Sequence, residues 1–472
     1  MMLKRFAQSL LCSPAARSQV STTTSTSLFF GLLLIITIQV VRSMASVNTA
    51  LPALSDRALS QKESVWVEFI QLALEHKPIN LGQGFPDYAA PKIVTDALTN
   101  VGNNSNVLLQ QYTRGYGHPR LVNALSKLYS QLVGQQINPN KEVLVTVGAY
   151  EALFCAFMGI TNPGDEVIVI EPFFDCYAPM IELAGGVPVY VPLRPSVNAN
   201  ASAISSGDWK LDMQELESKF TNKTKAIVIN TPHNPLGKVF TRDELMAIGD
   251  LCKKHNIIAI MDEVYEWITF DGNQHVRMAS LPGMWERTIT IGSAGKTFSV
   301  TGWKLGWAYG PEHLIKALQL IHQNTVYTCA TPLQEAVAMG FEAEIPKLGS
   351  NQSYWKELSD DLKQKRDKIV QFLTSVNMKP TIPQGGYFLL ADFSDLANRL
   401  DFSSVKGGTQ DYRFTKWLTI EKKLQGIPPS FFYSEGHRNL IENYIRFCYF
   451  KKDETLDQAA DVIRKLKQSL EK

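Results

Sequence analysis

Four short hydrophobic runs in the sequence are each followed by residues that can bind a ligand or react with one. The runs span residues 143–147, 226–229, 257–261 and 288–291. The residues that follow them are, in chain order, Gly148-Ala149-Tyr150, Asn234, Asp262 with Tyr265, and Lys296. Because ligand sites of α/β proteins form where parallel strands end, at the carboxyl edge of the sheet, these four segments predict one shared site.

Each of these segments, taken alone, has an ordinary structural explanation beside the chemical one. Gly148 opens a predicted helix whose free N–H groups could hold a phosphate, although a glycine there also suits a simple turn. Lys296 lies in a predicted short loop and could form a Schiff base, whereas most lysines are solvated surface residues. Asp262 follows an apolar run, so we expect it to be buried and to need a cationic partner, as a structural ion pair also would. An aspartate, a lysine and a phosphate cradle together are what a pyridoxal phosphate site needs.

The elements that must position these residues follow from the alternation of patterns along the chain. After residue 50, short β-branched runs alternate with longer helical patterns, which predicts an α/β fold with a mostly parallel sheet covered by helices. A helical pattern spans residues 151–158, and residues 411–418 form an amphipathic helical pattern. The Ser-rich stretch 195–207 predicts a surface loop.

Length and composition exclude several classes of protein. The chain has 472 residues, of which 45% are hydrophobic and 19% charged, and this composition excludes disorder, collagen and coiled coil. The length predicts two or three domains, or one large α/β unit with an appendage. Lys and Arg number 47 against 45 Asp and Glu, a net charge of +2, so electrostatics give no reason to expect nucleic acid as a partner.

The six cysteines are scattered, with no CxxC pair. This pattern predicts neither a disulfide framework nor a zinc site, so we expect no metal, and it favours a reducing compartment.

The N-terminal segment differs from the rest of the chain. Residues 1–46 contain basic residues and many Ser and Thr but no Asp or Glu, which resembles an organelle transit peptide and favours mitochondria. The apolar run Leu28–Val41 could instead be the core of a secretory signal, and Met44 could start a shorter cytoplasmic product. The run is too short for a comfortable membrane span, so no stable anchor is expected after processing.

Residues 60–470 resemble the class I/II aminotransferases, which are pyridoxal phosphate enzymes of fold type I. The motifs that carry the resemblance, in the order and spacing of that family, are Asn234-Pro235-x-Gly237, Asp262-x-x-Tyr265 and Ser293-x-x-Lys296. Segments 81–87, 111–118 and 171–177 are similar to the kynurenine aminotransferases, also called glutamine transaminase K or cysteine-S-conjugate β-lyase. Residues 323–332 look closest to the mitochondrial members of that subgroup.

The resemblance implies a role for each residue around pyridoxal 5′-phosphate. Lys296 would bond to the cofactor and then move a proton, and Asp262 would pair with the pyridine nitrogen, which makes the ring an electron sink. Asn234 and Tyr265 would bind the phenolate oxygen, and Phe174 would stack on the ring, although core packing would also explain Phe174. The residues implied at the phosphate are Gly148, Ala149, Ser293 and Lys304, with Tyr112 reaching in from a second subunit of a homodimer, and Tyr150 is a further residue implied to bind the cofactor. Aspartate-type enzymes carry arginine where this chain has Lys304. The lysine provides a single point charge and lacks the paired N–H donors of a guanidinium.

The resemblance also implies how the substrate binds. Arg446, within the strand-like run 444–448, would hold the α-carboxylate beside the backbone of Gly84, while a salt-bridged edge-strand arginine is the alternative. The side-chain pocket would be lined by aromatic residues, namely Trp66, Tyr112, Tyr150 and Tyr327. Residues 324–328 contain no cation, so dicarboxylates should bind poorly. The subgroup often has Phe-His where this chain has Tyr327-Thr328, and fine specificity therefore depends on this departure.

The implied activity is transamination of kynurenine, to kynurenic acid, and of other aromatic or neutral amino acids such as glutamine, methionine and phenylalanine with 2-oxo acids. Cysteine-S-conjugate β-lyase action as the main activity is an alternative. A non-catalytic binding protein is another, but such a protein should have lost Lys296 or Asp262. The expected domains are a leader at 1–48, an arm and first part of a small α+β domain at 49–95, a large cofactor domain at 96–345, and the rest of the small domain at 346–472.

Overall fold

The computed structural model describes residues 51–196 and 203–471. The predicted leader, the run Leu28–Val41 and Met44 lie outside these residues. Contacts between residues group Lys62–Lys472 into one compact unit, and helix α3 (Asp56–Leu59) belongs to the segment that precedes it. The predicted division of residues 62–472 into a large and a small domain stays a prediction.

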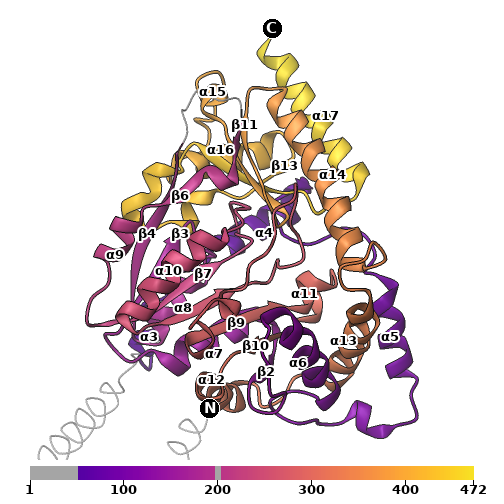
Figure 1. Ribbon diagram of the computed structural model, residues 1–472. Helices are drawn as coiled ribbons and strands as arrows, with labels where there is room; N and C mark the ends of the chain where they lie inside the picture. Colours follow the sequence, from indigo (N-terminus) through magenta and orange to yellow (C-terminus); the bar gives the residue numbers. More distant parts are fainter. Residues whose placement is uncertain (1–50, 197–202, 472) are drawn as a thin grey trace, which may run out of the picture. The chain divides into compact units, whose positions relative to one another are not determined.

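The main sheet has eight strands and is mostly parallel, as the sequence predicts (Figure 1). Only β10 and β6 run antiparallel to their neighbours. The strands are, in spatial order, β2 (Val143–Thr146), β10 (Gly306–Tyr309), β9 (Thr288–Ser293), β8 (Ile258–Asp262), β7 (Thr224–Asn230), β3 (Glu166–Glu171), β4 (Val187–Pro195) and β6 (Trp209–Leu211). The four predicted hydrophobic runs are therefore β2, β7, β8 and β9.

Both faces of this sheet are buried. Successive side chains of its central strands point to opposite faces, and helices cover each face. On β7, Ala226 and Val228 pack into one core, while Ile227 and Ile229 pack into another. The first core is closed by α7 (Gly148–Ile160), α8 (Tyr177–Leu183) and α12 (Glu312–Thr325). The second is closed by α9 (Met213–Ser218) and α10 (Arg242–His255). This packing on both faces holds the ends of the strands in place relative to one another.

A further group of helices covers the β2 and β10 end of the sheet. It comprises α6 (Pro119–Val133) and α13 (Thr331–Glu344), whose buried residues pack with Trp307 and Tyr309 of β10. Helix α5 (Lys92–Gly102) packs along α13.

A second sheet of four strands lies in the C-terminal part of the chain. Its order is β14 (Tyr444–Cys448), β12 (Phe388–Asp392), β11 (Lys379–Ile382) and β5 (Ile204–Ser205). Helices α14 (Tyr354–Thr374), α16 (Gln410–Glu421) and α17 (Asp453–Leu470) contribute to the core on this sheet. Helix α16 confirms the predicted amphipathic helix at residues 411–418.

The prediction of a surface loop over residues 195–207 is wrong at its described end, since Ile204 and Ser205 pair with β11 as strand β5. The pairing supplies backbone partners that no local sequence pattern announces. Residues 197–202 of this stretch lie outside the described part.

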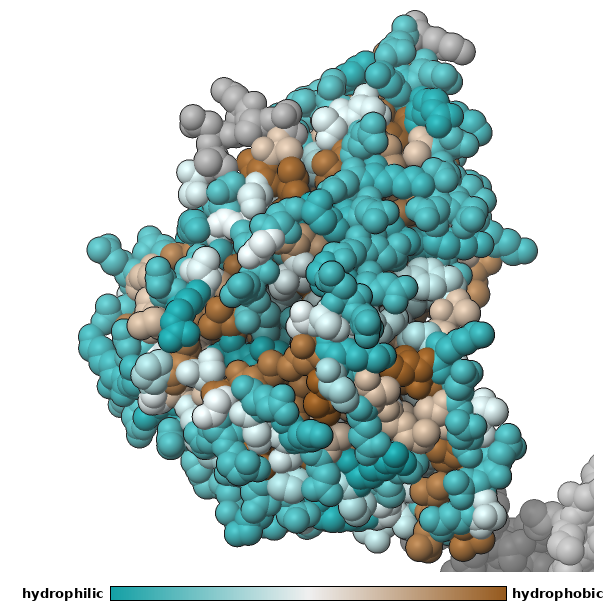
Figure 2. Space-filling view, turned by 45° about the vertical axis from the view of Figure 1, so that its right-hand side comes forward, coloured by the Kyte–Doolittle hydropathy of each residue, from teal (hydrophilic) through white to brown (hydrophobic). Residues whose placement is uncertain are grey.

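The remaining elements are short or lie beside the second sheet. Strand β1 (Ile79–Asn80) pairs with β13 (Leu424–Gln425), and α4 (Val65–His76) packs near α16. Two four-residue helices, α11 (Ala294–Thr297) and α15 (Ser394–Ala397), complete the set together with short 3-10 turns. Among the described residues, no helix combines the length and apolar character needed to cross a membrane. Figure 2 shows one face of the protein, on which hydrophobic patches lie among a predominantly hydrophilic surface.

Candidate active site

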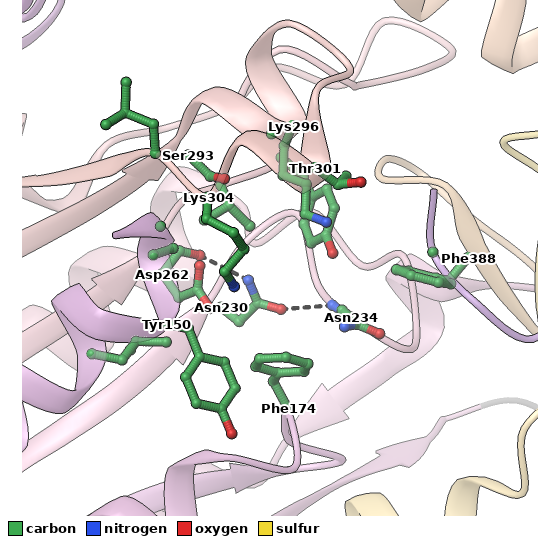
Figure 3. Close-up of a pocket in the computed structure, with 18 of the residues that line it drawn as sticks. Tyr150, Phe174, Asn230, Asn234, Asp262, Ser293, Lys296, Thr301, Lys304 and Phe388 are labelled. Atoms are coloured by element: carbon green, nitrogen blue, oxygen red, sulfur yellow. Dashed lines mark hydrogen bonds between the residues drawn. The ribbon is translucent and has the colours of Figure 1, made fainter. Parts of the chain in front are cut away.

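All but two of the residues predicted for the site line one pocket at the carboxyl ends of the main strands. They come from separate segments of the chain and include the ends of β7, β8 and β9 and the start of α7. The predicted residues in the pocket are Trp66, Gly84, Gly148, Ala149, Tyr150, Phe174, Asn234, Asp262, Tyr265, Ser293, Lys296, Lys304 and Arg446. Figure 3 shows many of these side chains pointing toward a common space.

The start of α7 is suited to an anion. The helix begins at Gly148, whose positive φ of 75° favours glycine, and no side chain caps its first turn. Uncapped N–H groups and the helix dipole both favour negative charge. Lys304 adds a cation, since its Nζ lies 3.7 Å from the point where a Cβ on Gly148 would be. This corner of the pocket can hold a phosphate.

Asp262 is 4% exposed, and its two carboxylate oxygens have different surroundings. Tyr177 donates a hydrogen bond of 2.6 Å to Oδ2, while Oδ1 is buried without a partner among the described residues. No cationic side chain among the described residues pairs with Asp262, so the structural ion pair is not found, and the pairing with a cofactor nitrogen stays a prediction. Burial raises the pKa of Asp262 to about 6. A buried oxygen without a donor fits the protonated nitrogen of a pyridine ring.

Lys296 lies in the short helix α11 and not in a loop as predicted. The N–H of Ala294, the first residue of this helix, donates to the Leu305 oxygen at 3.0 Å, and Gly295 lies close to the backbone of Thr301. Its Nζ lies 5.9 Å from the ring centre of Tyr265. Burial lowers the pKa of Lys296 to about 8. A sizeable fraction of the amine is then neutral near pH 7 to 8, as a nucleophile or a base must be.

Asn230 joins the strand ends to one another, although the sequence analysis did not single it out. Its Nδ2 donates to the backbone oxygen of Asp262 at 2.8 Å, and its Oδ1 accepts from the Asn234 N–H at 2.6 Å (Figure 3). The signal available in the sequence was a polar residue directly after the run 226–229. Asn230 thereby fixes Asn234 with respect to Asp262.

Arg446 is 1% exposed and bonds only to neutral groups. Its Nη1 donates to Asn234 Oδ1 at 3.0 Å, and its Nη2 donates to the Gly82 oxygen at 2.8 Å. Its Nε has no partner in the described part of the chain, and burial lowers its pKa to about 10. Although β14 is an edge strand, the salt-bridge alternative is wrong, since no carboxylate of residues 51–196 and 203–471 pairs with this guanidinium. A buried unpaired cation in a pocket is suited to an anionic ligand.

Aromatic residues surround this guanidinium. The ring centre of Trp66 lies 5.1 Å and that of Phe388 4.2 Å from its Cζ. Trp66 is held by its indole N–H, which donates to Asp175 Oδ2 at 2.9 Å. Tyr150 and Phe174 pack edge to face on the same pocket, with centres 6.2 Å apart. Phe388 and Tyr177 were not predicted here, because their partners lie far away in sequence.

Tyr112 and Tyr327 do not line this pocket. Their rings pack edge to face, 5.9 Å apart, and the residues are 83% and 60% exposed. The prediction that both serve the site of a second subunit stays a prediction.

Comparison with known proteins assigns the fold. The sequence profile of the family "Aminotransferase class I and II" matches residues 76–463. The chain belongs to this family. Kynurenine--oxoglutarate transaminase 3 of Homo sapiens is 50% identical over 460 residues, which cover 97% of this chain and 98% of that protein. Kynurenine--oxoglutarate transaminase 1 of Homo sapiens is 48% identical over 406 residues, 86% of this chain and 96% of that one.

A solved structure agrees with these relatives. Bna3p from Saccharomyces cerevisiae, a candidate kynurenine aminotransferase, superposes with a TM-score of 0.82 at 34% identity, covering 89% of this chain and all of that one. The predicted α/β fold of type I is thus confirmed, and the chain is an aminotransferase. Its family uses pyridoxal phosphate. Three features of the described residues fit that group: Asp262 Oδ1 has no partner, no side chain caps the start of α7, and Lys296 has a lowered pKa.

Proposed function

We propose that this aminotransferase binds pyridoxal 5′-phosphate and transfers the amino group of kynurenine, and of other aromatic or neutral amino acids, to a 2-oxo acid. The observation that carries the proposal is the buried guanidinium of Arg446, which faces the pocket without a carboxylate. Two relatives at 50% and 48% identity are kynurenine--oxoglutarate transaminases, which supports kynurenine as a donor and oxoglutarate as an acceptor.

The α-carboxylate of the substrate would bind Arg446. A buried charge without a counter-ion is costly, and a carboxylate relieves this cost through paired, charge-assisted hydrogen bonds. Asn234 and Gly82 already hold two of its nitrogens and so fix the plane of the guanidinium. The backbone of Gly84, on the same pocket, can approach the carboxylate closely because it carries no side chain.

The cofactor would lie between Asp262 and the start of α7. Asp262 would keep the pyridine nitrogen protonated, Asn234 and Tyr265 would face the phenolate oxygen, and Lys304 with Ser293 would hold the phosphate. When bound, pyridoxal phosphate supplies an electron-withdrawing ring that makes the Cα proton of an amino acid acidic. Lys296 would accept that proton and deliver it to C4′ of the cofactor, the carbon on the other side of the transferred nitrogen.

The side chain of the donor would meet an aromatic wall. Trp66, Tyr150 and Phe174 line the pocket. Its cations among the described residues are Lys296, Lys304 and Arg446, and each already has a role in this scheme. A second, distal carboxylate would have no cation left, which favours kynurenine, glutamine, methionine and phenylalanine over aspartate.

The active unit would be a homodimer. The rings of Tyr112 and Tyr327 pack together and are exposed, and Val107 and Leu108, shortly before Tyr112 in the chain, are exposed as well. Large exposed apolar side chains of this kind suit a protein interface. In the dimer, Tyr112 would reach the partner's phosphate site and Tyr327 its side-chain pocket.

We also propose a mitochondrial location, because the N-terminal segment contains basic residues but no Asp or Glu. Imaging of a C-terminal fluorescent fusion, with and without residues 1–48, tests it: loss of mitochondrial signal on truncation is expected. Uptake into the secretory route would contradict it.

The function is tested with a matrix of donors and acceptors on purified protein. Donors are kynurenine, glutamine, methionine, phenylalanine, aspartate and a cysteine S-conjugate, each with 2-oxoglutarate and other 2-oxo acids. We expect kynurenic acid from kynurenine, activity with the neutral donors and little with aspartate. Preference for aspartate would contradict the proposal, and pyruvate with ammonia from the S-conjugate, without amino transfer, would make β-lyase action primary.

A further inference from the structure

Tyr387 is a buried residue beside the pocket that contacts two of the groups on which the proposed function depends. It is fully buried and directly precedes Phe388, the first residue of β12. Its hydroxyl donates to the Gly84 oxygen at 3.1 Å, and its ring centre lies 5.5 Å from Lys296 Nζ. It therefore contacts both the carboxylate end of the site and the amine that moves the proton.

The contact with Gly84 is close. A Cβ on Gly84 would lie 3.2 Å from Tyr387 Cε2 and 2.4 Å from Phe388 Cζ. The glycine backbone thus rests directly on the two rings, and only glycine fits there. Tyr387 therefore contacts Gly84 twice, through its ring and through the bond from its hydroxyl to the Gly84 oxygen.

The contact with Lys296 is chemical as well as steric. The face of an aromatic ring stabilises an ammonium but not a neutral amine. Tyr265 and Tyr387 both present ring faces to Lys296, and their rings meet edge to face 5.1 Å apart. The other charged or titratable groups that act on this amine are Asp262, Lys304, Arg446 and Cys448. Burial lowers the pKa of Lys296, and the ring faces oppose that effect.

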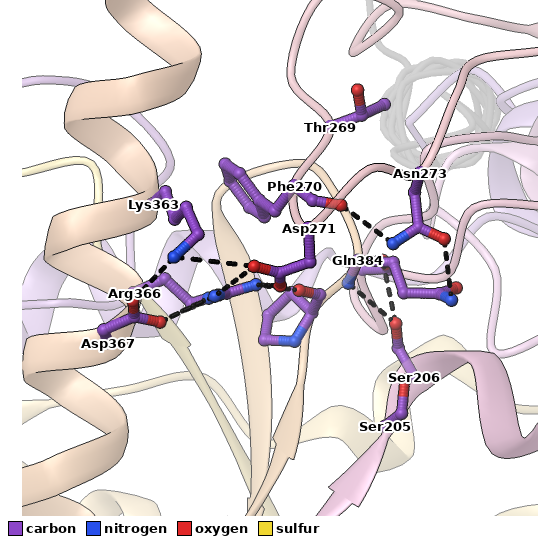
Figure 4. Close-up of polar contacts among 12 residues, drawn as sticks. Ser205, Ser206, Thr269, Phe270, Asp271, Asn273, Lys363, Arg366, Asp367 and Gln384 are labelled. Atoms are coloured by element: carbon purple, nitrogen blue, oxygen red, sulfur yellow. Dashed lines mark hydrogen bonds and ion pairs between the residues drawn. The ribbon is translucent and has the colours of Figure 1, made fainter.

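The turn before Tyr387 is held from several sides, which leaves the residue little freedom. Gln384 donates through Nε2 to Asn273 Oδ1 at 3.1 Å and through its backbone N–H to Ser206 Oγ at 3.0 Å (Figure 4). Arg366, which also pairs with Asp271, donates to the Pro383 oxygen at 2.9 Å (Figure 4). Backbone bonds to the same turn come from Gly237, Ile268, Phe270 and, through its hydroxyl, Tyr449.

On the basis of the proposed function, we propose that Tyr387 is a positioning residue that joins the two ends of the active site. Its hydroxyl orients the Gly84 backbone toward the substrate α-carboxylate, and its ring face holds the nitrogen of Lys296. The two contacts use different parts of one side chain, so they can be tested separately.

The role of the hydroxyl is tested with Tyr387→Phe, which keeps the ring. We expect the KM for the amino donor to rise about tenfold, as for loss of one buried hydrogen bond, with kcat within about twofold. Tyr129→Phe is the control, because it also removes a buried tyrosine hydroxyl from an oxygen, Glu266 Oε1 at 2.6 Å, but neither residue lines the pocket or contacts the turn before Tyr387. An unchanged KM in Tyr387→Phe, or an equal rise in Tyr129→Phe, would overturn the proposed role of the hydroxyl.

The role of the ring is tested by placing phenylalanine or pentafluorophenylalanine at position 387. The two have nearly the same shape, but fluorination removes the attraction of the ring face for a cation. The readout is the pH midpoint of the visible absorbance of the holoenzyme, which reports the proton on the Lys296 nitrogen. We expect the midpoint to fall by about half a pH unit in the fluorinated protein. Equal midpoints in the two proteins would overturn the proposed role of the ring at position 387.

These outcomes are separable from those of the donor matrix. The absorbance titration needs no amino donor, and the KM comparison can use any donor that the protein accepts. If kynurenine is not turned over while the midpoint shifts, the proposed donor is wrong and the role of Tyr387 stands. If kynurenine is turned over and neither variant differs from its control, the role of Tyr387 is wrong and the proposed function stands.

Discussion

The hydroxyl of Tyr177 donates a 2.6 Å hydrogen bond to Oδ2 of Asp262, a residue 85 positions further along the chain. Burial raises the pKa of the Asp262 carboxyl, and the Tyr177 hydroxyl opposes this by stabilising the charged form. The bond also fixes which carboxylate oxygen is free. Oδ1 has no partner in the part of the chain that the structure describes, and so it is the oxygen available to a cofactor nitrogen.

Tyr177→Phe should raise the pKa of Asp262, because it removes a donor that favours the carboxylate. Since Asp262 acts when ionised, the acidic limb of the kcat pH profile should move to higher pH, and the rate at pH 7 should fall about tenfold. The measurement is the pH profile of kcat with a saturating donor.

Tyr129→Phe is the control for this variant. Tyr129 also donates a buried 2.6 Å bond to a carboxylate, Glu266 Oε1, but neither residue lines the pocket. Its loss should lower stability without moving the profile. A similar shift in both variants would mean that Tyr177 acts through general stability.

Asp262→Asn should weaken catalysis and stabilise the cofactor-free protein. Its pKa is raised from 3.8 to about 6 in the folded state, so burying the carboxylate costs stability as pH rises from 3.8 to about 6, and the full cost is present above that pH. The variant should therefore gain up to about 3 kcal/mol at pH 8 and about half as much at pH 5. Urea unfolding of cofactor-free wild type and variant at the two pH values measures this.

The same variant should lower kcat by about 10² to 10³, because an amide cannot hold the pyridine nitrogen in its charged form. Cofactor content should change much less, since the phosphate corner at Gly148 and Lys304 is intact. Equal rates at equal cofactor occupancy would show that Asp262 is only structural.

Lys296→Ala should abolish turnover and the covalent link to the cofactor. Borohydride treatment of wild type should fix pyridoxal phosphate on the peptide that contains Lys296, as mass spectrometry of digests would show. Lys304→Ala is the comparison: it should lower cofactor affinity but keep the fixed adduct at saturating cofactor. Full activity of Lys296→Ala would remove the basis of the proposed chemistry.

The sequence predicts the strand ends well because their signal is local. A run such as 226–229 is apolar at every position since β7 is buried on both faces, and the first polar residues after it mark the edge of the sheet. The resemblance then supplied the roles of Asn234, Asp262 and Lys296, whose positions in one pocket the structure shows.

Contacts between distant segments could not be predicted in this way. The Tyr177 hydroxyl binds one oxygen of Asp262, and no spacing in the sequence relates the two residues. Strand β5 forms only because β11, more than 170 residues later, offers backbone partners to Ile204 and Ser205. The position of Tyr387 depends on a turn held by Arg366 and Gln384, so its contact with Gly84 belongs to the tertiary structure alone.

Arg446→Lys should weaken every amino donor by a similar factor. A lysine cannot keep the bonds to Asn234 and Gly82 and also pair twice with a carboxylate, and the α-carboxylate is common to all donors. We expect kcat/KM to fall about ten- to hundredfold for kynurenine, glutamine and phenylalanine alike.

Arg277→Lys is the matched control, since Arg277 is also buried but pairs with Glu266 outside the pocket. It should lower stability and leave kcat/KM nearly unchanged. A fall in both variants would point to a general effect of removing a buried guanidinium.

The donor series separates the carboxylate site from the side-chain pocket. Aspartate would bring a second carboxylate against Trp66 and Phe174, where the described residues of the pocket leave no cation for it, at a cost of several kcal/mol. Wild type should therefore turn over glutamine and kynurenine at concentrations where aspartate gives no product. Substituting Tyr327 should change the ranking of donors, because it acts only on the side chain, while Arg446→Lys should preserve the ranking. A wild-type preference for aspartate, or an Arg446→Lys protein that discriminates between donors, would show that the two pockets are assigned wrongly.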